Sequence, residues 1–217
     1  AGGGLAALEA ANREEVARRG DAYRAKAKAQ TAAERHADLA TAARRTMKRI
    51  SDALRDTLIA SAPSVAVKDE TPNGGWALDF NGAELRFLGA DLVSLNAWQN
   101  VAPFDVVAHA AISVTASDSS YRGSTEYKGR SHSLWYCDAQ TQDRFGWFET
   151  AFWWPYGPGQ SSPGWPSISP ESKAPASDVG EALRGGMSSL QVARPFEPVT
   201  IDDLDSFIDR WGGWFAA

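Results

Sequence analysis

The sequence predicts an α+β fold in which a long N-terminal helical segment packs on an antiparallel β-meander of about seven strands, followed by a C-terminal amphipathic helix. Residues 5–60 contain no proline and one glycine. Short runs of strand-forming residues, separated by turn residues, follow up to residue 154. Near the end of the chain the apolar residues return to helical spacing. We therefore divide the chain into three parts, which are a helical segment (1–62), a sheet (63–154), and an irregular segment with a closing helix that packs on the sheet (155–217).

The first part is rich in Ala, Arg, Glu, Lys and Gln, which favour helix by intrinsic propensity. Gly20 and the capping-box pattern from Thr31 to Glu34 are two points at which the segment would turn if it were a helical hairpin. We favour one long or kinked helix and keep the hairpin as the alternative.

An apolar stripe is clearer in the second half of this segment. Its members recur at intervals of three and four, and they are His36, Ala40, Ala43, Met47, Ile50, Leu54 and Leu58. We expect residues 36–60 to cover the sheet, because helices in proteins gain most of their stability from such packing. The candidates for helix packing or oligomer contacts are Met47, Ile50, Leu54 and Leu58.

The first half of the segment has a weaker stripe among its alanines, made of Leu5, Leu8, Val16 and Tyr23. So few large apolar residues bury little surface alone. This half either pairs with another chain, as in a coiled coil, or stands largely in solvent.

The pattern changes period after Pro63, which ends the helix. We expect strands at eight places, which are residues 65–68, 76–80, 83–88, 92–98, 104–115, 121–127, 131–138 and 145–154. Asn81-Gly82 is the strongest hairpin signal, because a type I′ turn needs two residues that tolerate positive φ. Gly89 is expected to mark a further turn. Short connections join antiparallel neighbours, so a meander follows.

Residues 155–199 hold most of the 11 prolines and are predicted to be a long irregular segment. Thr200, with acidic residues directly after it, then predicts a helix N-cap. The apolar face of this last helix consists of Leu204, Phe207, Ile208, Trp211 and Phe215.

The strand predicted at 145–154 has aromatic residues on both of its faces. The simplest interpretation is that it lies between a helix and the 155–199 segment or a partner. The alternative is a ligand pocket on a curved sheet, with aromatic walls and a few polar groups. The candidate ligand-binding or partner-binding residues are Trp147, Glu149, Trp153, Trp154, Tyr156, Trp165, His109, His132 and Tyr136.

No catalytic residue is assigned. Cys137 and His132 are five residues apart on one predicted strand and so point to opposite faces. Three scattered histidines and one cysteine do not have metal-ligand spacing, and the phosphate-binding and nucleophile-elbow motifs are absent from the sequence. We expect no cofactor and no metal.

Charge is distributed unevenly within a net charge of -5. Residues 5–60 carry 12 basic and 8 acidic residues, which leaves 10 basic and 19 acidic residues elsewhere. A nucleic-acid partner is therefore unlikely. The sequence has no apolar run long enough for a membrane span and no signal-peptide pattern, and its composition is typical of a GC-rich bacterial genome. We expect a bacterial cytoplasmic protein.

These observations favour a non-catalytic interaction protein. The N-terminal helix would serve self-association or docking of a protein partner, and the aromatic sheet would serve recognition. The alternative is a small-molecule-binding protein or an enzyme with a cavity on the curved sheet, whose acid–base residues would come from His109, His132, Tyr136 and Glu149.

Overall fold

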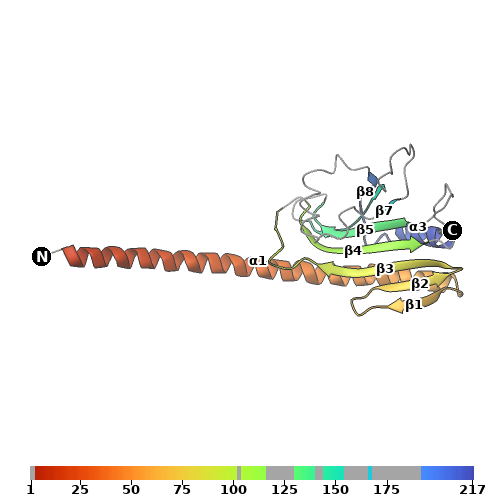
Figure 1. The fold of residues 1–217 in the computed structure, drawn as a ribbon, viewed down its shortest axis with the longest axis horizontal. Coiled ribbons are helices and arrows are strands. Elements are labelled where there is room, and N and C mark those ends of the chain that lie inside the picture. Colours follow the sequence, from red (N-terminus) through yellow and green to blue (C-terminus); the bar gives the residue numbers. More distant parts are fainter. Residues whose placement is uncertain (1–2, 102–103, 116–129, 140–143, 154–165, 168–191) are drawn as a thin grey trace, which may run out of the picture. The chain divides into compact units, whose positions relative to one another are not determined.

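The computed structural model describes residues 3–101, 104–115, 130–139, 144–153, 166–167 and 192–217. It contains two compact units, residues 1–38 and 39–217, and each is described by itself. Helix α1 (Gly3–Ser61) continues through Gly20 and Thr31, so the segment is one helix and not a hairpin (Figure 1). It ends two residues before Pro63, as the sequence predicts.

An antiparallel sheet forms the centre of the second unit (Figure 1). Its strands are β1 (Ala66–Glu70), β2 (Trp76–Phe80), β3 (Ala83–Leu92), β4 (Val106–Thr115), β5 (Arg130–Cys137), β6 (Gly146–Trp153), β7 (Pro166–Ser167) and β8 (Val192–Pro198). In the described part of the chain the strands from β1 to β7 follow one another in sequence order, and β8 also pairs with β6. The predicted meander is confirmed.

The hairpin between β2 and β3 turns at Asn81 and Gly82, as predicted. Both residues have positive φ, 51° and 82° respectively, and Phe80 pairs with Ala83 across the turn. This is the backbone that an Asn-Gly pair favours.

The prediction of a turn at Gly89 and a separate strand at 92–98 is wrong. β3 runs through Gly89 to Leu92, and the chain then turns at residues 95–97. Gly89 has a packing role instead, because a Cβ on it would lie 2.2 Å from the backbone oxygen of Asn73 in the β1–β2 loop. The missing side chain lets this loop lie directly against β3.

Two further differences concern the later segments. Residues 192–198, expected to be irregular, form β8, whereas the strand predicted at 121–127 lies outside the described residues. The last helix, α3 (Asp205–Ala216), begins five residues after Thr200, and Leu204 at its N-cap makes no side-chain capping bond. The predicted cap at Thr200 is wrong because Thr200 and Asp203 form a β-bridge around a turn at residues 201–202, so the helix begins only at Asp205.

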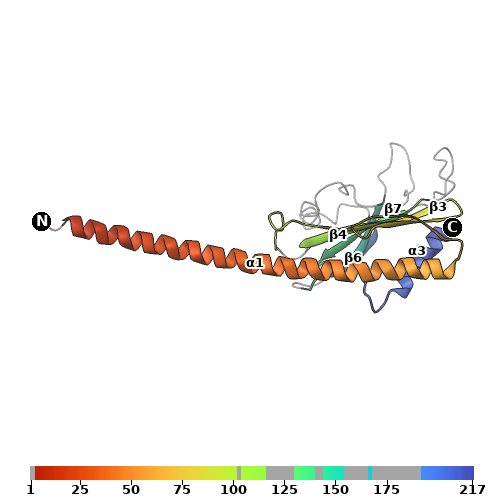
Figure 2. The same cartoon turned by 90° about the horizontal axis from the view of Figure 1, so that it is seen from below.

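The part of α1 after residue 38 and helix α3 lie on the same side of the sheet (Figure 2). Both insert apolar side chains into one core, with Met47, Ile50 and Leu54 from α1 and Phe207 and Trp211 from α3. The predicted packing of the N-terminal helical segment on the sheet and the amphipathic character of the closing helix are thus confirmed.

Candidate functional site

A buried polar network lies where β5, β6 and α3 meet. At its centre is Glu149, which is 1% exposed. Its carboxylate lies 2.6 Å from Nδ1 of His132 and accepts hydrogen bonds from Arg210 at 2.5 Å and from the indole Nε1 of Trp211 at 3.2 Å. A carboxylate with three donors and one cationic partner satisfies the usual condition for burying a charge.

The register of β5 and β6 brings Glu149 and His132 together. Leu134 on β5 pairs with Glu149 on β6, so His132 lies two residues along on the same face, as a diagonal neighbour. Arg210 and Trp211 come from α3, where Trp211 is fully buried and the Arg210 side chain is 20% exposed.

Burial keeps His132 neutral. Desolvation lowers its pKa below the usual value and outweighs the opposing effect of the Glu149 carboxylate, whose charge Arg210 already compensates. A neutral His132 that carries its proton on Nδ1 donates a hydrogen bond from this atom to the Glu149 carboxylate. Its Nε2 is buried without a hydrogen-bond partner in the described residues, and the rings of Trp211 and Trp214 lie edge-on, with centroids at 4.9 Å and 5.3 Å.

His109 does not join this network. It pairs in register with Trp135, three positions from the pair that holds His132, and therefore faces the other side of the sheet. Its ring packs on Trp135 at an interplanar angle of 36°, with centroids 4.3 Å apart. Burial lowers the pKa of His109 to about 4, although Asp91 on β3 acts in the opposite direction.

Trp147 and Tyr136 are core residues on the helix-covered face. The indole Nε1 of Trp147 lies 3.1 Å from both the Ala43 carbonyl oxygen and the Thr46 hydroxyl of α1. The ring of Tyr136 packs on Trp147 with centroids 5.5 Å apart, and burial raises the pKa of its phenol. Cys137 is fully buried, and burial raises the pKa of its thiol.

The remaining aromatic candidates lie wholly or partly outside the described residues. The backbone of Trp153 belongs to β6, but its side chain and the residues Trp154, Tyr156 and Trp165 lie outside the described part of the structure. The structure thus brings together Glu149, His132, Trp147 and Tyr136 on one face, and it places His109 on the other.

Two grooves border α1 within the second unit. The hairpin groove, of about 570 Å³, lies between α1 and the β1–β2 hairpin and includes Ser51, Trp76 and Phe87. The helix groove, of about 740 Å³, lies between the C-terminal end of α1 and α3 and includes Leu58, Phe80, Ile208, Phe215, Asp205 and Asp209. Neither groove is lined by Glu149, His132, Tyr136 or His109.

Sequence analysis assigned no role to Arg210, to Asp205 or to Asp209. The available signal was the presence of charged residues beside an apolar helix face, with Arg210 directly before the buried Trp211. Such a pattern is equally typical of a solvated face, so it does not identify a buried partner.

No protein-family model, no curated protein and no solved structure matches this chain. In the part of the chain that the structure describes, no helix combines the length and the apolar character needed to cross a bilayer. Among the same residues, no cluster of three or more His, Cys, Asp and Glu side chains is arranged to hold a metal ion.

Proposed function

We propose that this chain is a non-catalytic interaction protein that self-associates through residues 3–38 of α1. The observation that carries the proposal is the N-terminal stripe, by which we mean the members of the weaker stripe whose side chains the structure describes, Leu5, Leu8 and Val16. These side chains are 73%, 67% and 62% exposed. Large apolar side chains that are exposed and recur on one face of a helix are typical of an interface between chains.

The lack of packing around this helical segment supports the same proposal. In residues 4–38 every side chain that the structure describes is exposed or half-buried. Exposed ion pairs within the segment, such as those of Arg18 and Arg19 with Glu15, contribute little to the stability of a helix. Most of the stability of helices in proteins comes from packing, and pairing with a second helix would supply burial that this segment lacks.

The enzyme alternative has less support. The side chains of His132 and Glu149 are 2% and 1% exposed, so a substrate cannot reach them in this conformation. Recognition by the aromatic sheet stays a prediction, since Trp154, Tyr156 and Trp165 are among its candidates and lie outside the described residues.

Sedimentation equilibrium of the full chain at micromolar concentrations tests the proposal. The test variant carries Leu5→Gln, Leu8→Gln and Val16→Gln, which remove the stripe and keep helix propensity. We expect the native chain to form a dimer or larger oligomer and the variant to shift toward monomer.

A matched control carries Ala7→Gln, Ala10→Gln and Ala17→Gln. These three exposed residues lie outside the stripe on the same helix and receive the same new side chains. The control is expected to associate like the native chain. A native chain that stays monomeric at all concentrations, or a control that dissociates as far as the stripe variant, contradicts the proposal.

A further inference from the structure

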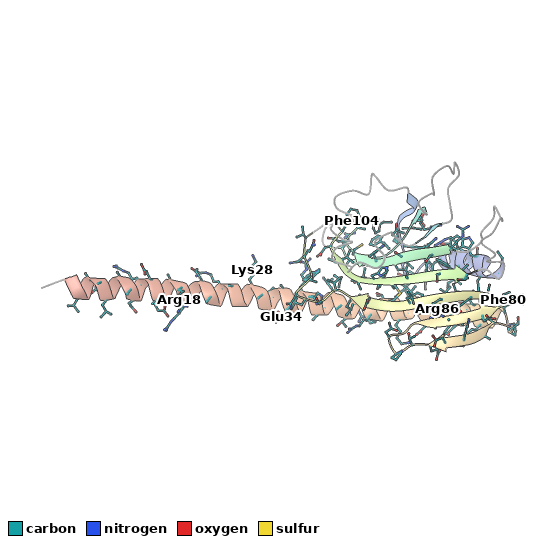
Figure 3. The ribbon with its side chains drawn as sticks, viewed as in Figure 1. Arg18, Lys28, Glu34, Phe80, Arg86 and Phe104 are labelled. Atoms are coloured by element: carbon teal, nitrogen blue, oxygen red, sulfur yellow. The ribbon has the colours of Figure 1, made fainter. Side chains whose placement is uncertain are left out.

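The helix groove has an apolar floor made by two helices and a strand. Leu58 from α1, Phe80 from β2 and Phe215 from α3 contribute to it, and the rings of Phe80 and Phe215 lie with centroids 5.8 Å apart. Figure 3 labels Phe80 at the end of the sheet that this groove borders. The groove offers an apolar surface that a further helix would cover.

Two glycines open one wall of this groove. At Gly212 a Cβ would lie 3.1 Å from Leu58 Cδ2, so α3 approaches α1 closely there. At Gly213 a Cβ would meet nothing within 4 Å. Because neither residue has a side chain, the backbone of α3 is accessible to an incoming helix at this point.

The rim of the groove is acidic. Asp205 and Asp209 are exposed and one helical turn apart on α3, and no lysine or arginine of the described residues lines the groove. Neither aspartate takes part in an ion pair within the same part of the chain. An apolar floor with an acidic rim is complementary to a helix that has an apolar stripe flanked by basic residues.

The first unit of the chain has this chemistry. Residues 13–28 include six basic and three acidic residues, and this range contains Val16 and lies C-terminal to Leu5 and Leu8. Arg18 and Arg19 share the single carboxylate of Glu15, so one of the two positive charges has no counterpart there. Figure 3 shows Arg18 and Lys28 projecting from α1.

Charge also decides between this occupant and a nucleic acid or an anionic membrane. Phosphate groups would be repelled by Asp205 and Asp209. By contrast, residues 13–28 carry an excess of three basic residues, and residues 39–217 carry an excess of six acidic residues. The basic part of the helix of one copy and the acidic body of another therefore attract each other.

We propose that the helix groove receives the N-terminal helical segment of a second copy of this chain, with the stripe of Leu5, Leu8 and Val16 against the groove floor and the flanking basic residues beside Asp205 and Asp209. This inference rests on the proposed self-association and names the surface that takes part in it.

Charge reversal on the full chain tests the groove. The variant Asp205→Lys/Asp209→Lys should weaken self-association at least about tenfold in sedimentation equilibrium, because like charges would then meet. The control Asp202→Lys/Asp203→Lys makes the same change in net charge at two exposed residues that do not line the groove. It should associate within about threefold of the native chain.

Rescue makes the test specific. The variant Arg13→Glu/Arg19→Glu reverses two exposed residues next to the stripe and should also weaken association. A chain that carries both reversals presents acidic helices to a basic groove and should recover association to within about threefold of the native value. Circular dichroism of every variant confirms that α3 still folds, which matters because the substitution of Asp205 places a positive charge in the first turn of this helix.

The possible outcomes distinguish failure of the proposed self-association from failure of the groove assignment. A monomeric native chain overturns both self-association and this inference. If the stripe variant dissociates while the groove variant behaves like its control, self-association stands and the groove is overturned. Reversals that change the melting temperature of a monomer, with no effect on mass, would show that the segment contacts its own chain. That result overturns the assignment to a second copy.

Discussion

Replacing Glu149 with alanine should destabilise the fold by about 3–5 kcal/mol. Three donors share this carboxylate, at 2.5 Å from Arg210, 2.6 Å from His132 and 3.2 Å from Trp211. Each neutral donor that loses its buried acceptor costs about 1–3 kcal/mol. Removing one partner of a buried ion pair costs about 3–5 kcal/mol. These costs overlap because the three donors share one acceptor, and Arg210 keeps one fifth of its side chain in solvent, so we expect the loss to be close to that of breaking one buried ion pair.

Urea unfolding at neutral pH, followed by circular dichroism, measures this loss. The matched control is Glu197→Ala, because Glu197 on β8 is the register partner of Glu149 and also pairs with an arginine, Arg194. Its side chain is 48% exposed, so its removal should cost less than about 1 kcal/mol. Both variants lose one carboxylate, and only the loss of the buried one should lower the free energy of unfolding by several kcal/mol.

A double variant separates the effect of losing the charges from the effect of losing side-chain volume. Glu149→Leu together with Arg210→Met removes both charges and keeps much of the volume, so it should cost less than either single substitution. If Glu149→Ala costs less than about 1 kcal/mol and matches Glu197→Ala, then Glu149 is not the acceptor of a buried network and the reasoning is refuted.

Three other predictions address the rest of the second unit. With a pKa of about 4 in the fold and about 6.5 when unfolded, His109 contributes stability that is fully present above about pH 6.5 and lost as the pH falls toward 4. The loss is about 3 kcal/mol, so His109→Phe should flatten the pH dependence of urea unfolding, and NMR titration should give a pKa near 4. Gly89→Ala should destabilise by about 1–3 kcal/mol in the same assay because its Cβ meets the Asn73 backbone, whereas Gly213→Ala in open space should stabilise by about 0.5–1 kcal/mol. Trp147→Phe should cost about 1–3 kcal/mol, because the two acceptors on α1 lose their indole donor.

Most of the fold follows from local patterns in the sequence. The stripe from Met47 to Leu58 and the Asn81-Gly82 turn are short-range signals, and the structure realises both. The prediction of a turn at Gly89 failed because a glycine that makes room for a distant backbone looks the same in sequence as a glycine in a turn. The prediction of an N-cap at Thr200 failed because a threonine followed by acidic residues looks the same in sequence when it closes a turn, as Thr200 does in its bridge with Asp203.

The candidate site was only partly accessible to sequence reasoning. His132 and Glu149 were both named, but their contact depends on the pairing of Leu134 with Glu149, and register cannot be read from either strand alone. Arg210 could not be assigned to them. Its contact depends on how α3 is oriented on the sheet, and the spacing of apolar residues fixes only which face of the helix is buried.

Strand β6 bonds to both of the helices that cover the sheet. Trp147 donates to the backbone of α1, and Glu149, two residues later on the same face, accepts from α3. Apolar burial has no direction and would tolerate several positions of each helix along the sheet. An indole N–H or a carboxylate that misses its partner by one helical turn would instead be buried and unpaired, at a cost of about 1–3 kcal/mol or more. The polar atoms of this aromatic strand therefore select one position for α1 and one for α3 among those that the apolar core would accept.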